Sequence, residues 1–288
     1  MQWQFWIIQT LNSVAFGGLL FMLSSGFSLI FGLMRIPNLA HGAFFMLGAY
    51  FGYSLLKVDL PFWPAAIVGG LGVGLIGVVL ERFVLRRLAG NEQGQVLVTL
   101  GIAFIIADIC LVVWTGDPMP LAAPQALRPP LRVAGFAFPT YRLVVLAISL
   151  VAALWLYLLM ERTRLGAMIR AGVDDQPIAR VVGIKVSQLF TLVFSLGAAL
   201  AAFAGVVAAP YLSVYPGLDA EMLPLALIVV ILGGSGSLLG ALVGSFIIAF
   251  LYNFGQAKFP DLAYVIVFLP MLLVLIVRPQ GLFGRAGS

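Results

Sequence analysis

Apolar runs of membrane-spanning length, separated by short polar breaks, fill almost the whole chain. A helix needs about 20 apolar residues to cross the roughly 30 Å hydrocarbon core of a bilayer, because each residue adds about 1.5 Å. The pattern predicts an all-α, polytopic transmembrane helix bundle of about eight to nine segments in one domain, residues 1–288. We place the segments near residues 9–31, 39–57, 62–80, 95–115, 139–160, 188–209, 222–232 and 261–277, with one more run ending near residue 252.

The segment at 222–232 is too short for a full crossing, and the glycine-rich stretch GGSGSLLG (Gly233–Gly240) follows it. Two interpretations fit this break. In the first, the segment is a half-helix that lines a transport pathway, because non-helical backbone at membrane depth needs protein or a water-filled cavity around it. In the second, the glycines form a tight loop at the membrane surface. The first makes Gly233, Gly234, Ser235 and Gly236 candidate pathway residues.

Composition excludes a soluble protein. The chain is 62% hydrophobic and 9% charged, with a mean hydropathy of +1.11, whereas soluble domains contain about 25% charged residues. The net charge of +5 reflects cytoplasmic loops and does not indicate nucleic-acid binding. The start, MQWQFWIIQT, lacks the basic residues of a cleaved signal peptide. We therefore expect it to belong to the mature protein.

Basic residues divide unevenly between the two sides of the predicted bundle. With an external N-terminus and nine crossings, eleven lie inside and five outside, which accounts for all 16. Because cytoplasmic loops carry the excess of Lys and Arg, this bias predicts a cytoplasmic C-terminus, an external loop 116–138 and a cytoplasmic loop 161–187. The inner set is Arg35, Arg82, Arg86, Arg87, Arg162, Arg164, Arg170, Arg180, Lys185, Arg278 and Arg285; the outer set is Lys57, Arg128, Arg132, Arg142 and Lys258.

Three polar residues lie at or within apolar segments. Pro37 suits the start of the second helix, and Asn38 can accept hydrogen bonds from its free N–H groups. His41, the only histidine of the chain, is either a hydrogen-bonded structural residue between helices or a contact of a cytoplasmic gate. It has no companion ligands for a metal. Asp108 lies deep in a span, where an acid faces the translocation path, an interface between membrane subunits, or an internal hydrogen-bond donor.

The charged stretch 161–187 has features of two short helices. Arg170, Ala171 and Asp174 fall near helical spacing, and Asp174 or Asp175 can begin a second helix with Pro177 in its first turn. Gly183 then ends that helix. A short amphipathic helix at this surface indicates either docking to a soluble partner or a solvated loop held by lipid headgroups.

This stretch resembles the cytoplasmic loop of the high-affinity branched-chain amino acid permeases, the LivH-type subunits of ABC importers. The loop of that family reads Arg-Ala-x-x-x-Asp-x-x-x-Ala-x-x-x-Gly-Ile. GLMRIPNLAHGAFFMLGAY, GGSGSLLGALVGSFI and the tail RPQGLFG are similar to the same family, so the resemblance extends from residue 32 to residue 284. The positions that match the loop pattern are Arg170, Ala171, Asp175, Ala179, Gly183 and Ile184.

The resemblance implies a transport subunit of the bacterial cytoplasmic (inner) membrane rather than an enzyme. It implies pairing with a second, LivM-type permease, two cytoplasmic ATPases that hold ATP and Mg²⁺, and a periplasmic binding protein that delivers branched-chain amino acids or related small solutes. Loop 161–187 would then carry the helix that couples to an ATPase. The chain has no Gly-x-x-x-x-Gly-Lys motif of its own. The alternative function is an ion-coupled secondary transporter or channel, for which Asp108 is the one candidate coupling residue.

Opposite-side labelling tests the orientation argument. Cysteines at Ala126 and Gly172, each in a Cys110→Ala background, should react with a membrane-impermeant thiol reagent from opposite sides, with Ala126 accessible from outside. Labelling of both positions from one side would contradict the charge argument and both loop assignments.

Overall fold

The computed structural model describes residues 2–35, 37–133 and 136–284. Helices dominate, and each predicted membrane segment coincides with one, which confirms the all-α prediction for the membrane part of the chain. The long helices are α1 (Gln2–Met34), α2 (His41–Lys57), α3 (Phe62–Phe83), α4 (Glu92–Trp114), α5 (Thr140–Arg162), α8 (Val186–Leu212), α9 (Leu218–Gly233), α10 (Leu238–Lys258) and α11 (Ala263–Val277). The short elements are α6 (Arg164–Asp174), α7 (Gln176–Val181), β1 (Leu131–Val133), β2 (Phe136–Phe138) and the 3₁₀ turns η1 (Leu85–Leu88), η2 (Gln125–Leu127) and η3 (Pro260–Leu262).

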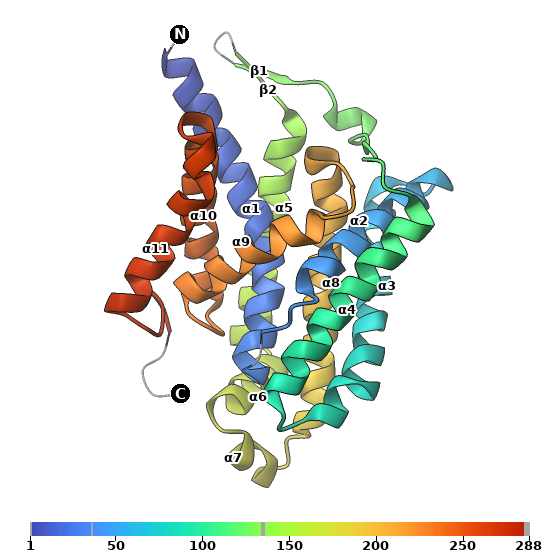
Figure 1. The fold of residues 1–288 in the computed structure, drawn as a ribbon, viewed down its shortest axis with the longest axis vertical. Helices are drawn as coiled ribbons and strands as arrows, with labels where there is room; N and C mark the ends of the chain where they lie inside the picture. The colour runs from blue at the N-terminus through green and yellow to red at the C-terminus, as the bar shows by residue number, and fades with distance from the viewer. Residues whose placement is uncertain (1, 36, 134–135, 285–288) are drawn as a thin grey trace.

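Seven helices of the described chain are long and apolar enough to cross a membrane. They are α1, α3, α4, α5, α8, α10 and the continuous segment of η3 and α11 (Pro260–Val277), whereas α2 and α9 have 17 and 16 residues. The chain therefore forms a multi-pass bundle with seven full-length spans and two shorter helices. Figure 1 places the start of α1 at one end of the bundle, where β1 and β2 lie, and α6 and α7 at the other. We call these the hairpin end and the α7 end.

The region after α8 differs in detail from its prediction. Helix α9 begins at Leu218, four residues earlier than expected, and ends at Gly233 without continuing through the glycines. It runs obliquely across the middle of the bundle (Figure 1). Gly234 and Gly236 have positive φ angles of 97° and 74°, which glycine adopts at no steric cost. They therefore turn the chain tightly from α9 into α10.

The loop 116–138 contains structure that the all-α prediction omitted. Strands β1 and β2 form an antiparallel hairpin in which Leu131 pairs with Phe138 and Val133 with Phe136. Farther back, Met119 forms a β-bridge with Val214, in the link between α8 and α9. This bridge fastens the loop to the bundle.

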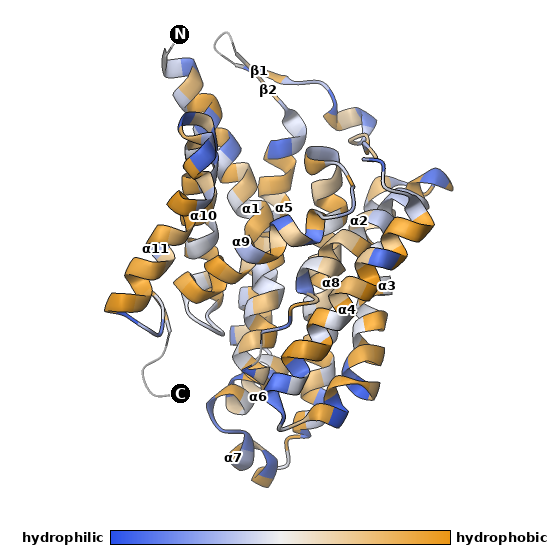
Figure 2. Cartoon of the chain, in the orientation of Figure 1, coloured by the Kyte–Doolittle hydropathy of each residue, from blue (hydrophilic) through white to orange (hydrophobic). Residues whose placement is uncertain are grey.

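Hydropathy follows the arrangement of the helices. Figure 2 shows orange, hydrophobic ribbon along the outer helices and more blue at the hairpin end and around α6 and α7. The outward faces of α4, α5 and α11 are apolar and exposed, whereas α1 is enclosed along most of its length. A water-soluble bundle would carry polar residues on the outward faces of α4, α5 and α11. The apolar faces therefore indicate that the bundle lies in a bilayer.

Small residues let α8 approach α2 and α3 closely. A Cβ at Gly205 would collide with the carbonyl oxygen of Phe45 in α2, and one at Gly48 would collide with the backbone of Ala202. On the other side, a Cβ at Gly74 would lie 3.0 Å from the Cβ of Ala199, and one at Gly77 would lie 3.0 Å from that of Ala198. The glycine-rich run of α3 is therefore a helix-packing face.

This packing predicts that Gly205→Ala lowers the melting temperature of the purified protein, because the added methyl must separate α8 from α2. Overpacking of this kind costs about 1–3 kcal/mol. Gly72→Ala is the matched control, since a Cβ there would make ordinary contact with Phe51 at 3.5 Å, and alanine favours the helix by about 1 kcal/mol. Equal melting temperatures for the two variants in one detergent would contradict the close α2–α8 contact.

Candidate functional site

Two short helices, α6 and α7, lie at the α7 end of the bundle, and each has a defined start and end. Thr163 caps α6 by accepting a hydrogen bond from the Gly166 N–H at 3.1 Å, and Asp175 caps α7 by accepting from Ile178 at 2.9 Å. Gly183 has a φ of 88°, and the Ile184 N–H donates back to the Ala179 carbonyl at 3.0 Å. The predicted second helix, with Asp175 at its start and Gly183 after its end, is confirmed.

Helix α6 is fastened to the ends of α1 and α8. Ile169 and Gly172 are buried, and a Cβ at Gly172 would lie 3.1–3.2 Å from the side chains of Leu33 and Leu189. Gln176 donates to the Leu33 carbonyl at 3.2 Å. Because Gly172 is enclosed, the exposed Val181 is the better inner position for the labelling experiment.

The predicted coupling residues divide between anchoring and exposed positions. Arg170 turns toward the end of α5, where it donates to the Met160 carbonyl and lies 3.6 Å from a carboxylate oxygen of Glu161. Ala179 is buried, Ala171 and Ile184 are half-buried, and Asp174 is exposed. Asp175 and Gly183 shape the ends of α7. Most of these residues therefore hold the two helices in place.

Helix α7 and the turn that follows it present three exposed apolar side chains that the sequence analysis missed. Ile178, Val181 and Val182 are 61%, 87% and 68% exposed. Their spacing of three and four residues places them on one side of a helical turn. Apolar residues at helical spacing inside an otherwise charged stretch are the signal that could have identified them.

Helix α2 begins inside the bundle rather than at its surface. His41 donates from Nε2 to the carbonyl oxygen of Leu23 in α1 at 2.9 Å, and its ring lies 5.2 Å from the Phe27 ring. Since an oxygen can only accept, Nε2 carries the proton in this contact. Leu23 lies eleven residues before Met34, where α1 ends, which is about 16 Å along the helix axis. After α1 ends, the chain therefore runs back into the bundle, and α2 starts at the depth of Leu23.

Asn38 shapes this re-entering segment but lies before the helix. Its side-chain oxygen accepts from the Ala40 N–H at 3.1 Å, and its carbonyl accepts from His41 at 3.1 Å. Thr99 of α4 accepts from the Leu39 N–H at 3.2 Å. Helix α2 thus starts at His41 rather than at Pro37, and its first turn has no side-chain cap. The prediction that the Asn38 side chain caps this helix is therefore wrong, because that side chain accepts from Ala40, before the helix begins.

Several buried polar atoms along α1 and α2 have no hydrogen-bond partner among the residues that the structure describes. Leaving such a group unsatisfied costs about 1–3 kcal/mol, so these atoms are where a polar solute or water would gain most. The atoms are Ser24 Oγ, Ser28 Oγ, Asn38 Nδ2, His41 Nδ1 and Tyr50 OH.

The glycine turn lies beside α6 at the α7 end. A cavity of about 510 Å³ is bounded by α6, the end of α1, the turn at 235–237 and the tail after α11. The tail closes the end of α9, because the Leu282 and Phe283 N–H groups donate to the Leu232 and Gly233 carbonyls at 2.8 and 3.0 Å. The candidate pathway residues Gly233 and Gly234 are buried there, whereas Ser235 and Gly236 are exposed.

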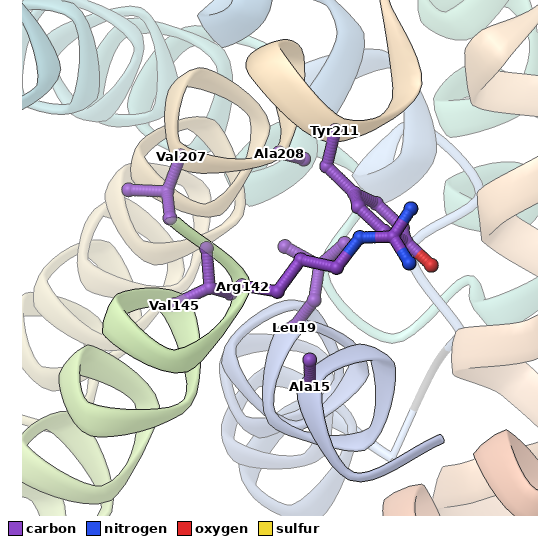
Figure 3. A pocket seen from close by; sticks show the side chains of 7 residues that line it. All are labelled: Ala15, Leu19, Arg142, Val145, Val207, Ala208 and Tyr211. Atoms are coloured by element: carbon purple, nitrogen blue, oxygen red, sulfur yellow. The ribbon is translucent and has the colours of Figure 1, made fainter. Parts of the chain in front are cut away.

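A second hollow, between α1, α5 and α8, is too small for a substrate. Its volume of about 10 Å³ holds one water at most. Figure 3 shows the Arg142 side chain extending across the ring of Tyr211, with its guanidinium carbon 4.3 Å from the ring centroid. Arg142 also donates to Asn12. This arginine fastens three helices together near the hairpin end.

Comparison with known proteins identifies the family. The family described as "Branched-chain amino acid transport system / permease component" matches residues 9–275. The chain belongs to this permease family. The ion-coupled alternative is not favoured.

Relatives support this membership over nearly the full length of the permease. The permease protein BraD of the Pseudomonas aeruginosa high-affinity branched-chain amino acid transport system is 26% identical, over 96% of this chain and 95% of its own length. Escherichia coli LivH, the corresponding permease protein, is 26% identical over 99% and 97%. LsrC, an autoinducer 2 import system permease of an Enterobacter species, is 28% identical over 75% and 73%.

A solved structure shares the fold. PsaBC from Streptococcus pneumoniae, determined in complex with Fab, aligns with a TM-score of 0.51 and 14% identity, over 92% of this chain and 89% of that chain. At this identity the similarity concerns the fold alone.

In the permease, Asp108 lies on the outward face of α4 and is exposed. It makes no hydrogen bond or ion pair with any residue that the structure describes. The sequence was consistent with three environments for Asp108, which are the translocation path, an interface between membrane subunits and an internal hydrogen bond. The internal hydrogen bond has no support in this geometry, and neither does a pathway inside the subunit.

A buried carboxylate ties α3 to the start of α8 in the permease. Glu81, at the end of α3, is 1% exposed and lies 3.0 Å from Arg86. Thr191 of α8 donates to the same carboxylate at 2.5 Å, and Arg86 donates to the Ser187 carbonyl at 3.0 Å. This network fixes the first turn of α8, a few residues after α7.

Removing the arginine should destabilise the permease. Arg86→Ala leaves the Glu81 charge buried with Thr191 alone, and breaking a buried pair in this way costs about 3–5 kcal/mol. We expect a lower melting temperature, and we expect Glu81→Gln in the Arg86→Ala background to restore part of it. Arg87→Ala, at an exposed neighbouring site, should cost less than about 1 kcal/mol. Equal effects of the two arginine variants would show that the Glu81 network contributes little.

Proposed function

We propose that this chain is the membrane-spanning permease subunit of an ATP-driven ABC importer in the bacterial cytoplasmic (inner) membrane. It translocates branched-chain amino acids or related small solutes that a periplasmic binding protein delivers. It works with a second, LivM-type permease and two cytoplasmic ATPases, which hold ATP and Mg²⁺. Family membership and the full-length similarity to BraD and LivH support this function.

The observation that carries the proposal is the exposed apolar surface of α7. Ile178, Val181 and Val182 are exposed on a helix that lies at the end of the bundle (Figure 1), while Asp175 and Gly183 fix the ends of the helix. A small rigid helix with apolar side chains in water is suited to insertion into a groove of a soluble partner. We assign loop 161–187 as the coupling element that binds an ATPase.

The charge distribution supports a cytoplasmic α7 end. Of the fifteen described basic residues, ten belong to segments at the α7 end and five to segments at the hairpin end; Arg285 lies outside the described residues. Cytoplasmic segments carry such an excess. The N-terminus and loop 116–138 are then external, where the binding protein docks, and the C-terminus is cytoplasmic.

The substrate gate is proposed at the start of α2 and the glycine turn. His41 and Asn38 carry unpaired polar atoms inside the bundle, and α2 starts at membrane depth, as pathway helices of transporters do. Ser235 and Gly236 of the glycine turn line the cavity beside α6, and Gly233 and Gly234 precede them as buried residues. A displacement of α6 would therefore reach the end of α9 directly.

Two variants of α7 test the proposal. Val181→Asp places a charge on a side chain that packs on nothing in this chain, so folding should be unaffected. Removing a contact at the centre of an interface costs about 2 kcal/mol or more, so ATPase copurification should fall roughly thirtyfold, and substrate uptake with it. Gly183→Val should act similarly, because a β-branched residue is strained at a φ of 88°.

Arg164→Ala is the control, since Arg164 is exposed at the membrane-proximal start of α6 and a lone surface charge contributes under about 1 kcal/mol. All three variants should reach wild-type abundance in the membrane. Full uptake and full ATPase recovery with both Val181→Asp and Gly183→Val would remove loop 161–187 as the coupling element.

A further inference from the structure

The outward face of α4 has a polar residue at its centre. Residues 97, 101, 104, 108 and 112 recur at helical spacing along this face, and the opposite face, with Thr99, Ala103, Ile106 and Cys110, is buried. Leu97, Phe104 and Val112 are 67%, 62% and 82% exposed. Asp108 lies among them. Helix α4 packs chiefly on α2 and lies at the edge of the bundle (Figure 1), so this face has no cover within the chain.

An acid in this position is costly in a bilayer. Asp108 lies six residues before Trp114, the end of α4, which places it about 9 Å inside the helix end. On the insertion scale an acid costs about 2.5–3.5 kcal/mol at the helix centre and less toward the helix end, and acyl chains offer no hydrogen-bond donor. The cost falls when a basic side chain covers the acid in a protein interface.

Gly101 adds an independent observation on the same face. It lies seven residues, or two turns, before Asp108, and a Cβ there would meet no atom within 4 Å. By contrast, the glycines of α2 and α8 each lie against a neighbouring helix. A glycine inside a helix costs about 1 kcal/mol relative to alanine. Nothing within this chain uses the space that Gly101 leaves, whereas a second helix could approach closely there.

We propose that this α4 face binds a transmembrane helix of a second, different membrane subunit, which presents a basic side chain at the depth of Asp108. A second copy of this chain fits poorly, because symmetric pairing through α4 would place two Asp108 carboxylates at equal depth. The described Lys and Arg residues also lie at helix ends or outside the long helices, so a copy supplies no basic group at that depth. The inference rests on the proposed two-permease importer and names the surface through which the permeases pair.

The test compares assembly in variants of the full transporter. The tagged permease is coexpressed with the membrane subunit and ATPases of its transport system, and recovery of the second membrane subunit is measured. Asp108→Leu and Gly101→Leu should each lower that recovery by roughly tenfold or more, as the loss of a buried charge pair or of close packing does in an interface. Asp108→Glu should retain most of it. Membrane abundance of the Asp108→Leu chain should equal or exceed that of the wild type.

Two controls keep the result specific. Ala147→Leu adds the same bulk to the exposed face of α5, and Asp117→Leu removes an exposed acid from the loop after α4; both should assemble normally. Full recovery with both Asp108→Leu and Gly101→Leu would overturn the inference. So would a disulfide between two copies carrying Gly101→Cys in the Cys110→Ala background. Purification of the wild-type chain without any second membrane subunit would contradict the proposed two-permease importer itself. Normal assembly of the wild type together with full recovery in both variants would contradict only the α4 inference.

Discussion

Close backbone contact along α8 is the interaction on which the rest of this permease depends. In a bilayer, lipid tails solvate apolar side chains as well as other helices do, so helix association relies on packing at small residues. Gly48 and Gly205 bring α2 against one side of α8, and Gly74 and Gly77 bring α3 against another. The buried Glu81–Arg86–Thr191 network then fixes the α7 end of the same contact. These three helices form one block whose members cannot move independently without opening a gap or breaking a buried ion pair.

This block explains how a displacement at α7 would reach the interior. Only four residues, 182–185, separate α7 from the first residue of α8. Both short helices are also bonded near the end of α1, α7 through Gln176 to Leu33 and α6 through Val173 to Arg35. A displacement of α7 would therefore act on α8, which packs closely on α1 as well as on α2 and α3. His41 of α2 is joined to Leu23 of α1 by a hydrogen bond in the same interior.

Local signals in the sequence predicted local structure well. Asp175, Pro177 and Gly183 fix the ends of α7 through their own backbone chemistry, so the helix was predictable without its neighbours. Features that depend on contacts between residues far apart in the sequence were not predicted. The start of α9 depends on Gly217, with a φ of 101°, and the role of Arg170 depends on the end of α5, neither of which periodicity reveals. The side on which Asp108 emerges was open for the same reason, because α4 is apolar all round and its rotation is set by packing on α2.

The distribution of polar groups inside the bundle bears on the transport cycle. Six of the eleven buried polar or charged residues lie between Ser13 and His41, and four of the five unpaired buried polar atoms belong to that stretch. Leaving such a group unpaired costs about 1–3 kcal/mol, so these atoms would gain from contact with water or a polar solute. This distribution supports the proposed gate at the start of α2, because an opening there would expose polar atoms as well as apolar side chains.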